Sequence, residues 1–161
     1  MYKTCVDNQA CEIINKPSFK LFELKDREIV LEFVDKYQPR SCEYNFSNLF
    51  SWQESYKYSW ATYNDRLVVY DGMNNSTFMP LGETFLPEEL VIFSLNMIKA
   101  GFSPNIGIVQ PEYLDNFPDI KQYYSIKEER DSAEYIYSVE TLFELSGAKL
   151  HKKRNLISQF C

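Results

Sequence analysis

The hydrophobic positions of the chain follow helical spacing in three segments of its first hundred residues. The first segment begins after Asp26, whose carboxylate suits a helix N-cap, and ends at Pro39. The second begins near Asn45, and the third spans residues 87–100, with Gly101 placed to terminate it. We therefore predict three helices. Their apolar positions are Ile29, Val30, Phe33, Val34 and Tyr37 in the first, Phe46, Leu49, Phe50 and Trp52 in the second, and Leu90, Val91, Phe93, Leu95 and Ile98 in the third.

Aromatic and β-branched runs between and after these helices predict strands. Residues 58–63 and 66–71 are two such runs, and the Asn64-Asp65 pair between them tolerates the positive φ angles of a tight hairpin turn. Further strands are expected at residues 19–24, 78–82, 106–110, 122–126 and 134–139, and short helical segments at residues 111–117 and 141–145. Together these elements predict an α+β fold with a mixed, largely antiparallel sheet flanked by helices.

The composition is that of one folded domain. Hydrophobic residues make up 45% of the 161 residues, which is far above the level of disordered chains. The N-terminus has no signal-peptide pattern, and no apolar run reaches the ~18 residues of a membrane span, so we expect a soluble, cytoplasmic protein. The single histidine and the cysteine spacing do not complete a zinc site, so we expect no metal and free thiols, although an even count would also allow two disulfides in a secreted protein. The cysteines are Cys5, Cys11, Cys42 and Cys161.

Charge is distributed unevenly along the chain. The formal net charge is −6, but residues 147–161 carry four cations and no acid, so the preceding residues carry −10. Such a strongly acidic body opposes nucleic-acid binding, which leaves the basic C-terminal segment as the candidate for anion binding. The segment follows Gly147 and stops at Cys161 without a terminating glycine, which we interpret as a helix cut before its natural end.

Three segments together resemble a known family. They are residues 43–52, the Phe-Met-Pro-Leu-Gly segment at residues 78–82, and residues 134–155, which end in Gly-Ala-Lys-Leu-His-Lys-Lys-Arg-Asn. In these segments the chain resembles uncharacterised bacterial proteins related to the C-terminal domain of phosphatidylglycerol lysyltransferases, and the similarity extends over most of residues 18–160. The last motif is the most specific of the three, because its residue order is hard to obtain from composition alone.

The resemblance implies a fold of two acetyltransferase-like halves, of the kind used by enzymes that transfer an aminoacyl group from charged tRNA to a lipid or peptide acceptor. This chain would supply only the first half. It would comprise a loose N-terminal arm at residues 1–17, an acetyltransferase-like α+β domain at residues 18–146, and a basic helix at residues 147–161 that leads toward a missing second half. The chain lacks the Gln/Arg-x-x-Gly-x-Gly/Ala loop that cradles a pyrophosphate in simpler acetyltransferases, so no cofactor is expected.

Candidate substrate-binding or phosphate-binding residues gather in the basic segment. In a helix, His151, Arg154 and Asn155 share one face. The cations would hold phosphate groups of aminoacyl-tRNA or of an acidic lipid head group, or else they form a solvated face or pair with the acidic body. His151 either acts as an acid or base or has a packing role. The candidates are Lys149, His151, Lys152, Lys153, Arg154 and Asn155, of which the Arg154-Asn155 pair is also a candidate bridge between the two halves.

Two functions of different classes remain open. The first is the N-terminal half of an aminoacyl- or acyltransferase that is inactive alone, whose partner is the missing second half-domain or a second copy of the chain. That partner would cover the apolar stripe of Leu150, Ile157 and Phe160. The alternative is a non-catalytic binding or scaffold module that dimerises or docks an acidic partner through the basic helix. No residue is assigned a catalytic role.

Overall fold

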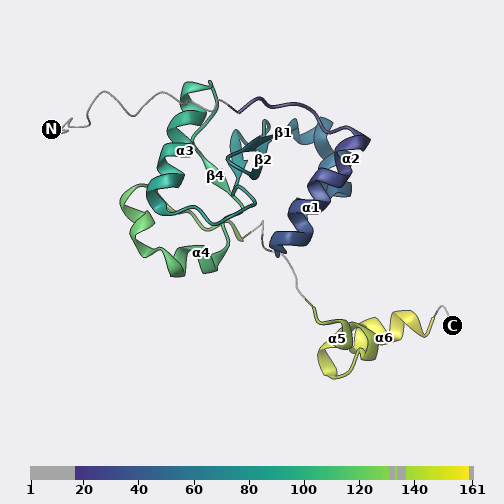
Figure 1. The fold of residues 1–161 in the computed structure, drawn as a ribbon. Helices are drawn as coiled ribbons and strands as arrows, with labels where there is room; N and C mark the ends of the chain where they lie inside the picture. The colour runs from purple at the N-terminus through teal and green to yellow at the C-terminus, as the bar shows by residue number, and fades with distance from the viewer. Residues whose placement is uncertain (1–16, 131–132, 134–136, 160–161) are drawn as a thin grey trace. The chain divides into compact units, whose positions relative to one another are not determined.

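The computed structural model describes residues 17–130, 133 and 137–159. The chain forms two compact units, Met1–Ile126 and Lys127–Cys161, which we call the body and the C-terminal unit. Figure 1 labels the α-helices and most of the strands. In chain order, with η for a 3-10 helix, the body contains η1 (Leu24–Asp26), α1 (Arg27–Tyr37), η2 (Cys42–Tyr44), α2 (Phe46–Tyr56), β1 (Tyr58–Tyr63), β2 (Arg66–Asp71), β3 (Ser76–Phe78), α3 (Pro87–Lys99), β4 (Ile106–Gly107), α4 (Pro111–Asn116) and η3 (Pro118–Gln122), and the C-terminal unit contains α5 (Val139–Glu144), η5 (Ala148–Leu150) and α6 (His151–Ile157).

The three predicted helices of the body are confirmed as α1, α2 and α3. Gln38 adopts a left-handed conformation after α1, one residue before Pro39. The Asn45 side chain accepts a hydrogen bond of 2.8 Å from the backbone N–H of Ser47, so this residue caps α2 as predicted. Helix α3 begins at Pro87, where the missing N–H of proline costs nothing, and Gly101 follows its end with a φ of 89°.

The sheet has the order β1-β2-β3-β4 and confirms the predicted α+β fold. Strands β1 and β2 form an antiparallel hairpin, in which Trp60 lies opposite Val69, and the turn residues Asn64 and Asp65 have φ angles of 45° and 56°. Strand β3 pairs antiparallel with β2, whereas β4 runs parallel to β3. The sheet is therefore mixed and largely antiparallel.

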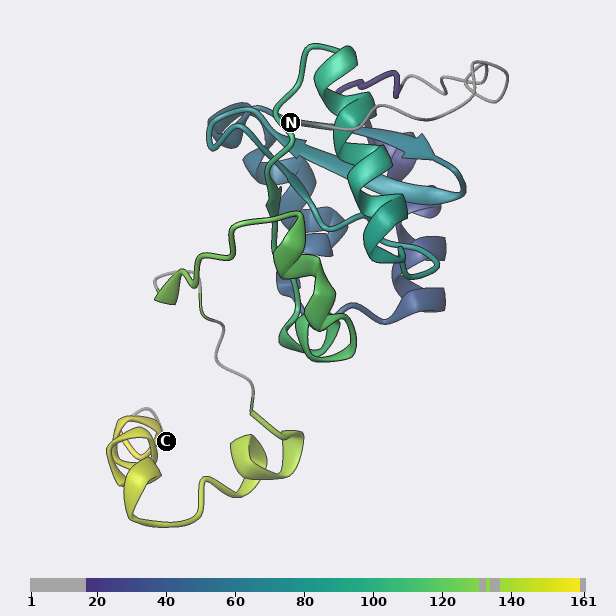
Figure 2. The same cartoon turned by 90° about the vertical axis from the view of Figure 1, so that its left-hand side faces the viewer.

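Each face of the sheet carries a separate hydrophobic core. Leu67 and Val69 of β2 belong to a core with residues of α1 and α2, whereas Val68 belongs to a core with residues of α3, α4 and η3. The alternation follows from the period-two geometry of a strand. Figure 2, turned by 90° from Figure 1, shows α3 lying along one side of the sheet with α1 and α2 on the other. The central strand β2 is thus covered on both faces.

The prediction of a strand at residues 19–24 is wrong except for one backbone pairing. Lys20 and Trp60 exchange hydrogen bonds of 2.9 and 2.8 Å, but the chain then turns into η1. Leu21 and Leu24 are exposed, so the alternation that predicted a strand does not place them in a core. The turn is stabilised by Asp26, whose carboxylate accepts the backbone N–H of Glu23 at 2.9 Å.

The strands predicted near the end of the body and beyond are also wrong where the structure describes them. Residues 123–126 form no strand, and the Tyr124 hydroxyl packs inward to donate to the Leu90 carbonyl at 2.9 Å. Residues 134–136 lie outside the described part, while Val139 begins α5, because the Ser138 hydroxyl caps this helix by accepting the Thr141 N–H at 3.1 Å. The strand predicted at residues 106–110 is reduced to the two residues of β4.

Several sequence predictions concern residues outside the described ranges. The predicted loose arm lies outside them except for its last residue, Pro17, which is buried. The same holds for Phe160 of the predicted apolar stripe and for three of the four cysteines, so the prediction of free thiols stays a prediction. Among the helices of the described ranges, none combines the length and apolar character needed to cross a membrane.

Candidate functional site

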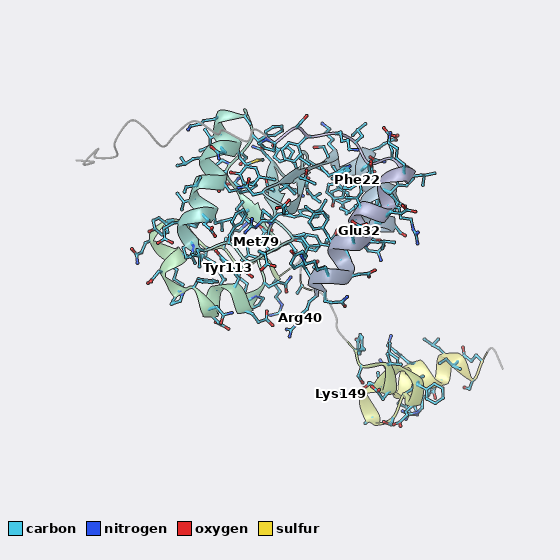
Figure 3. All side chains as sticks on the ribbon, viewed as in Figure 1. Phe22, Glu32, Arg40, Met79, Tyr113 and Lys149 are labelled. Carbon is cyan, nitrogen blue, oxygen red and sulfur yellow. The ribbon has the colours of Figure 1, made fainter. Side chains whose placement is uncertain are left out.

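The predicted anion-binding residues all lie in the C-terminal unit, on η5 and α6. Lys149 is the middle residue of η5 and is labelled in Figure 3. Lys152 and Lys153 lie in the first turn of α6. The side chains of Lys149, His151, Lys152, Lys153 and Asn155 are exposed, whereas Arg154 is partly buried. The candidate residues are therefore gathered on one short segment but do not share one environment.

Arg154 points back into the C-terminal unit. One guanidinium nitrogen, Nη1, donates to the carbonyl oxygen of Leu145 and, at 2.9 Å, to that of Gly147. These carbonyls belong to the loop between α5 and η5, where Leu145 and Gly147 have φ angles of 47° and 87°. Arg154 thus fastens α6 to the end of α5. A role for Arg154 in bridging two halves of a larger protein is not tested by these contacts and stays a prediction.

His151 and Asn155 share a helix face, as the spacing predicted. The Asn155 amide nitrogen lies 3.5 Å from His151 Nδ1, which is at the outer limit of a hydrogen bond. Both side chains are exposed. No carboxylate is hydrogen-bonded to the imidazole among the described residues, so the geometry gives His151 no oriented proton partner of the kind that acid-base catalysis uses.

The C-terminal unit buries little apolar surface of its own. Among its described residues only Leu145 is counted among the buried hydrophobic side chains, at 9% exposure. Phe143 of α5 is 89% exposed, and Val139, Leu142, Leu156 and Ile157 are exposed as well. Such a unit is held together by local hydrogen bonds more than by a core. The Arg154 contacts should therefore matter for its stability.

Replacing Arg154 with alanine is expected to loosen the C-terminal unit without changing the body. Loss of the two charge-assisted hydrogen bonds, each worth about 1.5 kcal/mol or more, should speed amide hydrogen exchange in α6 by roughly tenfold or more. Exchange measured by mass spectrometry on peptides from this unit tests the effect. Lys152→Ala is the matched control, because Lys152 is an exposed cation of the same helix. Equal exchange rates in the two variants would contradict the proposed fastening.

Two of the motifs that carry the family resemblance contact each other in the body. The Tyr44 hydroxyl donates to the Met79 carbonyl, and the Tyr44 ring packs edge-on against Phe78 at 5.9 Å. Met79, labelled in Figure 3, is partly buried. Gly82 closes the second motif where a Cβ atom would lie 2.4 Å from Cγ of Arg66. These motifs therefore specify how α2 and its preceding turn pack against the sheet.

Arg66 is held beside the shallow hollow at the end of the hairpin, a feature that the sequence did not single out. The guanidinium lies 4.0 Å from the centre of the Phe85 ring and donates to the carbonyls of Glu83 at 2.7 Å and Asn64 at 2.8 Å. The hollow has a volume of about 200 Å³. It is formed by the β1–β2 hairpin, the segment before α3 and helix α3, so no local pattern in the sequence could have revealed it. It is lined by Tyr63, Asn64, Arg66, Phe85, Glu89 and Ile92.

In the α3–α4 core, Ser94 and Tyr124 are hydrogen-bonded to other groups, whereas the buried Tyr113 hydroxyl has no hydrogen-bond partner among the described residues. Ser94 Oγ lies 2.7 Å from the Tyr124 hydroxyl and donates to the Pro104 carbonyl at 3.3 Å. Burial, together with smaller contributions from the neighbouring Tyr124, Glu88 and Glu89, raises the pKa of Tyr113 to about 12, so this phenol is neutral at pH 7. Within the described ranges, no group of three or more histidine, cysteine, aspartate or glutamate side chains is placed to hold a metal ion.

Comparison with known proteins confirms the suspected relationship. A family model described as phosphatidylglycerol lysyltransferase, C-terminal, matches residues 34–161. A solved structure of a conserved protein of unknown function from Bacteroides thetaiotaomicron is similar, with a TM-score of 0.72 and 31% sequence identity, over 89% of this chain and 50% of that one. The chain thus spans about half the length of that protein, and no curated protein matches it. Because the family model covers most of the sequence, including the basic segment, the chain belongs to the family of phosphatidylglycerol lysyltransferase C-terminal domains.

Proposed function

We propose that the chain is the first of two acetyltransferase-like halves of an aminoacyl- or acyltransferase and that it is inactive alone. The observation that carries this proposal is the family match, which runs through the body and the basic segment to residue 161. The length of the Bacteroides thetaiotaomicron protein supports the two-part arrangement, since this chain accounts for 50% of it. The missing half would be a further segment or a separate chain.

In this proposal the exposed lysines of the C-terminal unit bind phosphate. Lys149, Lys152 and Lys153 form no ion pair with another described residue, so their ammonium groups are available to an anion. Arg154 is already engaged with two carbonyls and would act by holding α6 in place. The anion would be the backbone of aminoacyl-tRNA, with the acceptor in the cleft completed by the second half.

Aminoacyl transfer suits a protein without a dedicated nucleophile. The amine or hydroxyl of the acceptor attacks the activated carbonyl of the donor ester, and the tRNA hydroxyl leaves, so the protein contributes mainly position and hydrogen-bond donors. A cleft between two halves provides both. The described residues of this chain would supply one wall of that cleft and the tRNA contact.

The test is transfer of a radiolabelled amino acid from charged tRNA to phosphatidylglycerol vesicles. We expect no product with residues 1–161 alone, and product when the chain is extended by a segment corresponding to the part of the Bacteroides thetaiotaomicron protein that this chain does not cover. Product from residues 1–161 alone would contradict the claim that this half is inactive. A folded, extended protein that transfers no amino acid to vesicles or to peptide amines would overturn the proposed function.

The same proposal predicts a salt-dependent affinity for tRNA that resides in three lysines. If Lys149, Lys152 and Lys153 each neutralise one phosphate, affinity should fall roughly 20- to 40-fold between 50 and 200 mM salt. Changing all three to glutamate should remove most of this dependence. The matched control changes three exposed lysines of the body, Lys25, Lys36 and Lys121, to glutamate. Equal weakening by the two triple variants, or binding to phosphatidylglycerol vesicles in place of tRNA, would contradict the assignment.

A further inference from the structure

Helix α3 carries an apolar stripe on the face opposite its core. Leu90, Phe93 and Met97 are buried against the sheet. On the other side Ile92, Leu95 and Ile98 are 56%, 50% and 51% exposed, although each is large and hydrophobic. Figures 1 and 2 show α3 on the outside of the body. Three exposed apolar side chains at a spacing of three residues on one helix are typical of a helix-packing surface.

Two opposite charges extend this stripe at its ends. At about 100° per residue, Glu88 and Lys99 both fall within roughly 40° of Leu95 around the helix axis. Both side chains are exposed. The Glu88 carboxylate accepts a long hydrogen bond of 3.4 Å from the Tyr123 hydroxyl. Along the chain, the outer face of α3 is therefore acidic at Glu88, apolar at Ile92, Leu95 and Ile98, and basic at Lys99. We call these five residues the α3 stripe.

A pattern of this kind is complementary to itself when reversed. We propose that a second copy of the chain packs on the α3 stripe, with the two α3 helices antiparallel about a two-fold axis at Leu95. Ile92 and Ile98 each lie about 4.5 Å along the axis from Leu95, so Ile92 lies at the same height along the dimer as the partner's Ile98, and the reverse. Leu95 meets its own copy at the axis. The antiparallel arrangement also opposes the two helix dipoles favourably.

The charges select this arrangement over a parallel one. In the antiparallel pair, distances along the helix are measured from the two-fold axis. Lys99 then lies at about 6 Å and the partner's Glu88 at about 10 Å in the same direction. A lysine side chain spans the gap of roughly 4 Å between them. A parallel pair would instead place like charges together at each end. The occupant that the stripe fits best is therefore another copy of this chain.

The size of the stripe sets the expected strength of the dimer. Three half-exposed side chains and two charges cover much less than the ~800 Å² per partner of a standard interface, so the dissociation constant should be about 10–100 μM. Sedimentation equilibrium of residues 1–161 from 5 to 500 μM should then show a monomer–dimer transition. A monomer throughout this range would overturn the proposal. The inference does not rest on the proposed function.

Leu95→Glu tests the location of the contact. Two carboxylates would meet at the axis, so the variant should remain monomeric at every concentration. The matched control is Leu24→Glu, because Leu24 is 71% exposed on η1, which precedes α1 on the other side of the sheet. Circular dichroism checks that both variants are folded. A dimer that persists in the first variant, or that is lost equally in both, would overturn the proposal.

Exchange of the two charges tests the direction of packing. Glu88→Lys and Lys99→Glu should each weaken the dimer by about threefold or more, and the double variant should restore it. The two residues are eleven positions apart on one helix, about 16 Å, so they cannot pair within a molecule and restoration reports a contact between copies. A double variant as weak as the product of the single effects would overturn the antiparallel arrangement.

Discussion

Replacing Phe93 with alanine is expected to lower the free energy of unfolding of the body by about 3–5 kcal/mol. Phe93 is 0% exposed, and its ring lies 5.1 Å from that of Tyr63 and 5.7 Å from that of Phe85. Truncation loses the transfer free energy of the ring and leaves a cavity between α3 and the hairpin. Since small domains are stable by only about 5–15 kcal/mol, a large fraction of the stability would be lost. Urea unfolding followed by circular dichroism measures the change.

The matched control for this core substitution lies two residues further along the same helix. Leu95→Ala removes a large hydrophobic side chain from the outer face of α3, where the side chain is 50% exposed. We expect it to change the stability of the monomer by less than about 1 kcal/mol, because alanine also favours the helix. The experiment must be done at protein concentrations well below the dissociation constant of the proposed dimer. Equal losses of stability in Phe93→Ala and Leu95→Ala would contradict the placement of Phe93 on the core face of α3 and of Leu95 on its exposed face.

The elements that were predicted correctly are those with local sequence signals at both ends. Strands β1 and β2 have the predicted bounds because Asn64 and Asp65 permit the positive φ angles of the turn, and the runs on either side are β-branched and aromatic. Helix α3 has Pro87 at its start and Gly101 after its end. These signals act over four residues or fewer, so the sequence contains them completely.

The wrong strands have two different causes, one a tertiary contact and the other a local turn. At residues 123–126 the decisive interaction is the hydroxyl of Tyr124, which reaches the Leu90 carbonyl and Ser94 in α3. At residues 19–24 it is Asp26, which was predicted as the cap of α1 but instead closes η1 by accepting the Glu23 N–H. Glu23 and Asp26 are three residues apart, as in a capping box, so this contact is local and competed with the strand pattern, whereas Tyr124 and Leu90 are 34 residues apart and no local pattern could reveal their contact.

The candidate site was predictable in its composition and not in its geometry. The cations at Lys149, Lys152 and Lys153 are exposed, which agrees with their position in a basic run. Arg154 belongs to the same run but turns inward, because the left-handed Leu145 and the following Gly147 present their carbonyls to it. The α3 stripe was visible only as an excess of apolar residues in that helix, whose outer face the sequence could not distinguish from its core face.

Asp26 is the charged group whose removal should cost the most stability in the body. Its carboxylate is 2% exposed, and it accepts hydrogen bonds from Lys20 Nζ at 2.8 Å and from the backbone N–H of Glu23 at 2.9 Å. The same ammonium lies 4.6 Å from the centre of the Trp60 ring. The Trp60 indole N–H is near enough to favour the charged carboxylate, although it is outside hydrogen-bond geometry. Asp26 and Lys20 therefore link η1 to the extended segment that precedes it and to Trp60 of β1.

Asp26→Asn should lower the free energy of unfolding by about 2–3 kcal/mol at pH 7, because hydrogen bonds to a buried charge are worth about 1.5–3 kcal/mol. The cost stays below that of breaking a fully buried ion pair, since Lys20 is half exposed and remains solvated. The control is Glu32→Gln on α1, labelled in Figure 3, whose exposed side chain should contribute less than about 0.5 kcal/mol. Urea unfolding of both variants measures the difference.

The pH dependence of this difference identifies the charge as its source. Burial raises the pKa of Asp26, but the hydrogen bonds from Lys20 and Glu23 and the charge of Lys20 outweigh burial and hold that pKa below its ordinary value. A carboxyl with a lowered pKa stabilises the fold above the unfolded-state pKa of about 3.9, and this stabilisation is lost as the pH falls through the folded-state pKa. The gap between wild type and Asp26→Asn should therefore be constant from pH 8 to 5 and shrink below about pH 4. A gap that stays constant to pH 2, or that closes while the pH is still above 5, would show that the carboxylate is not held in its charged form.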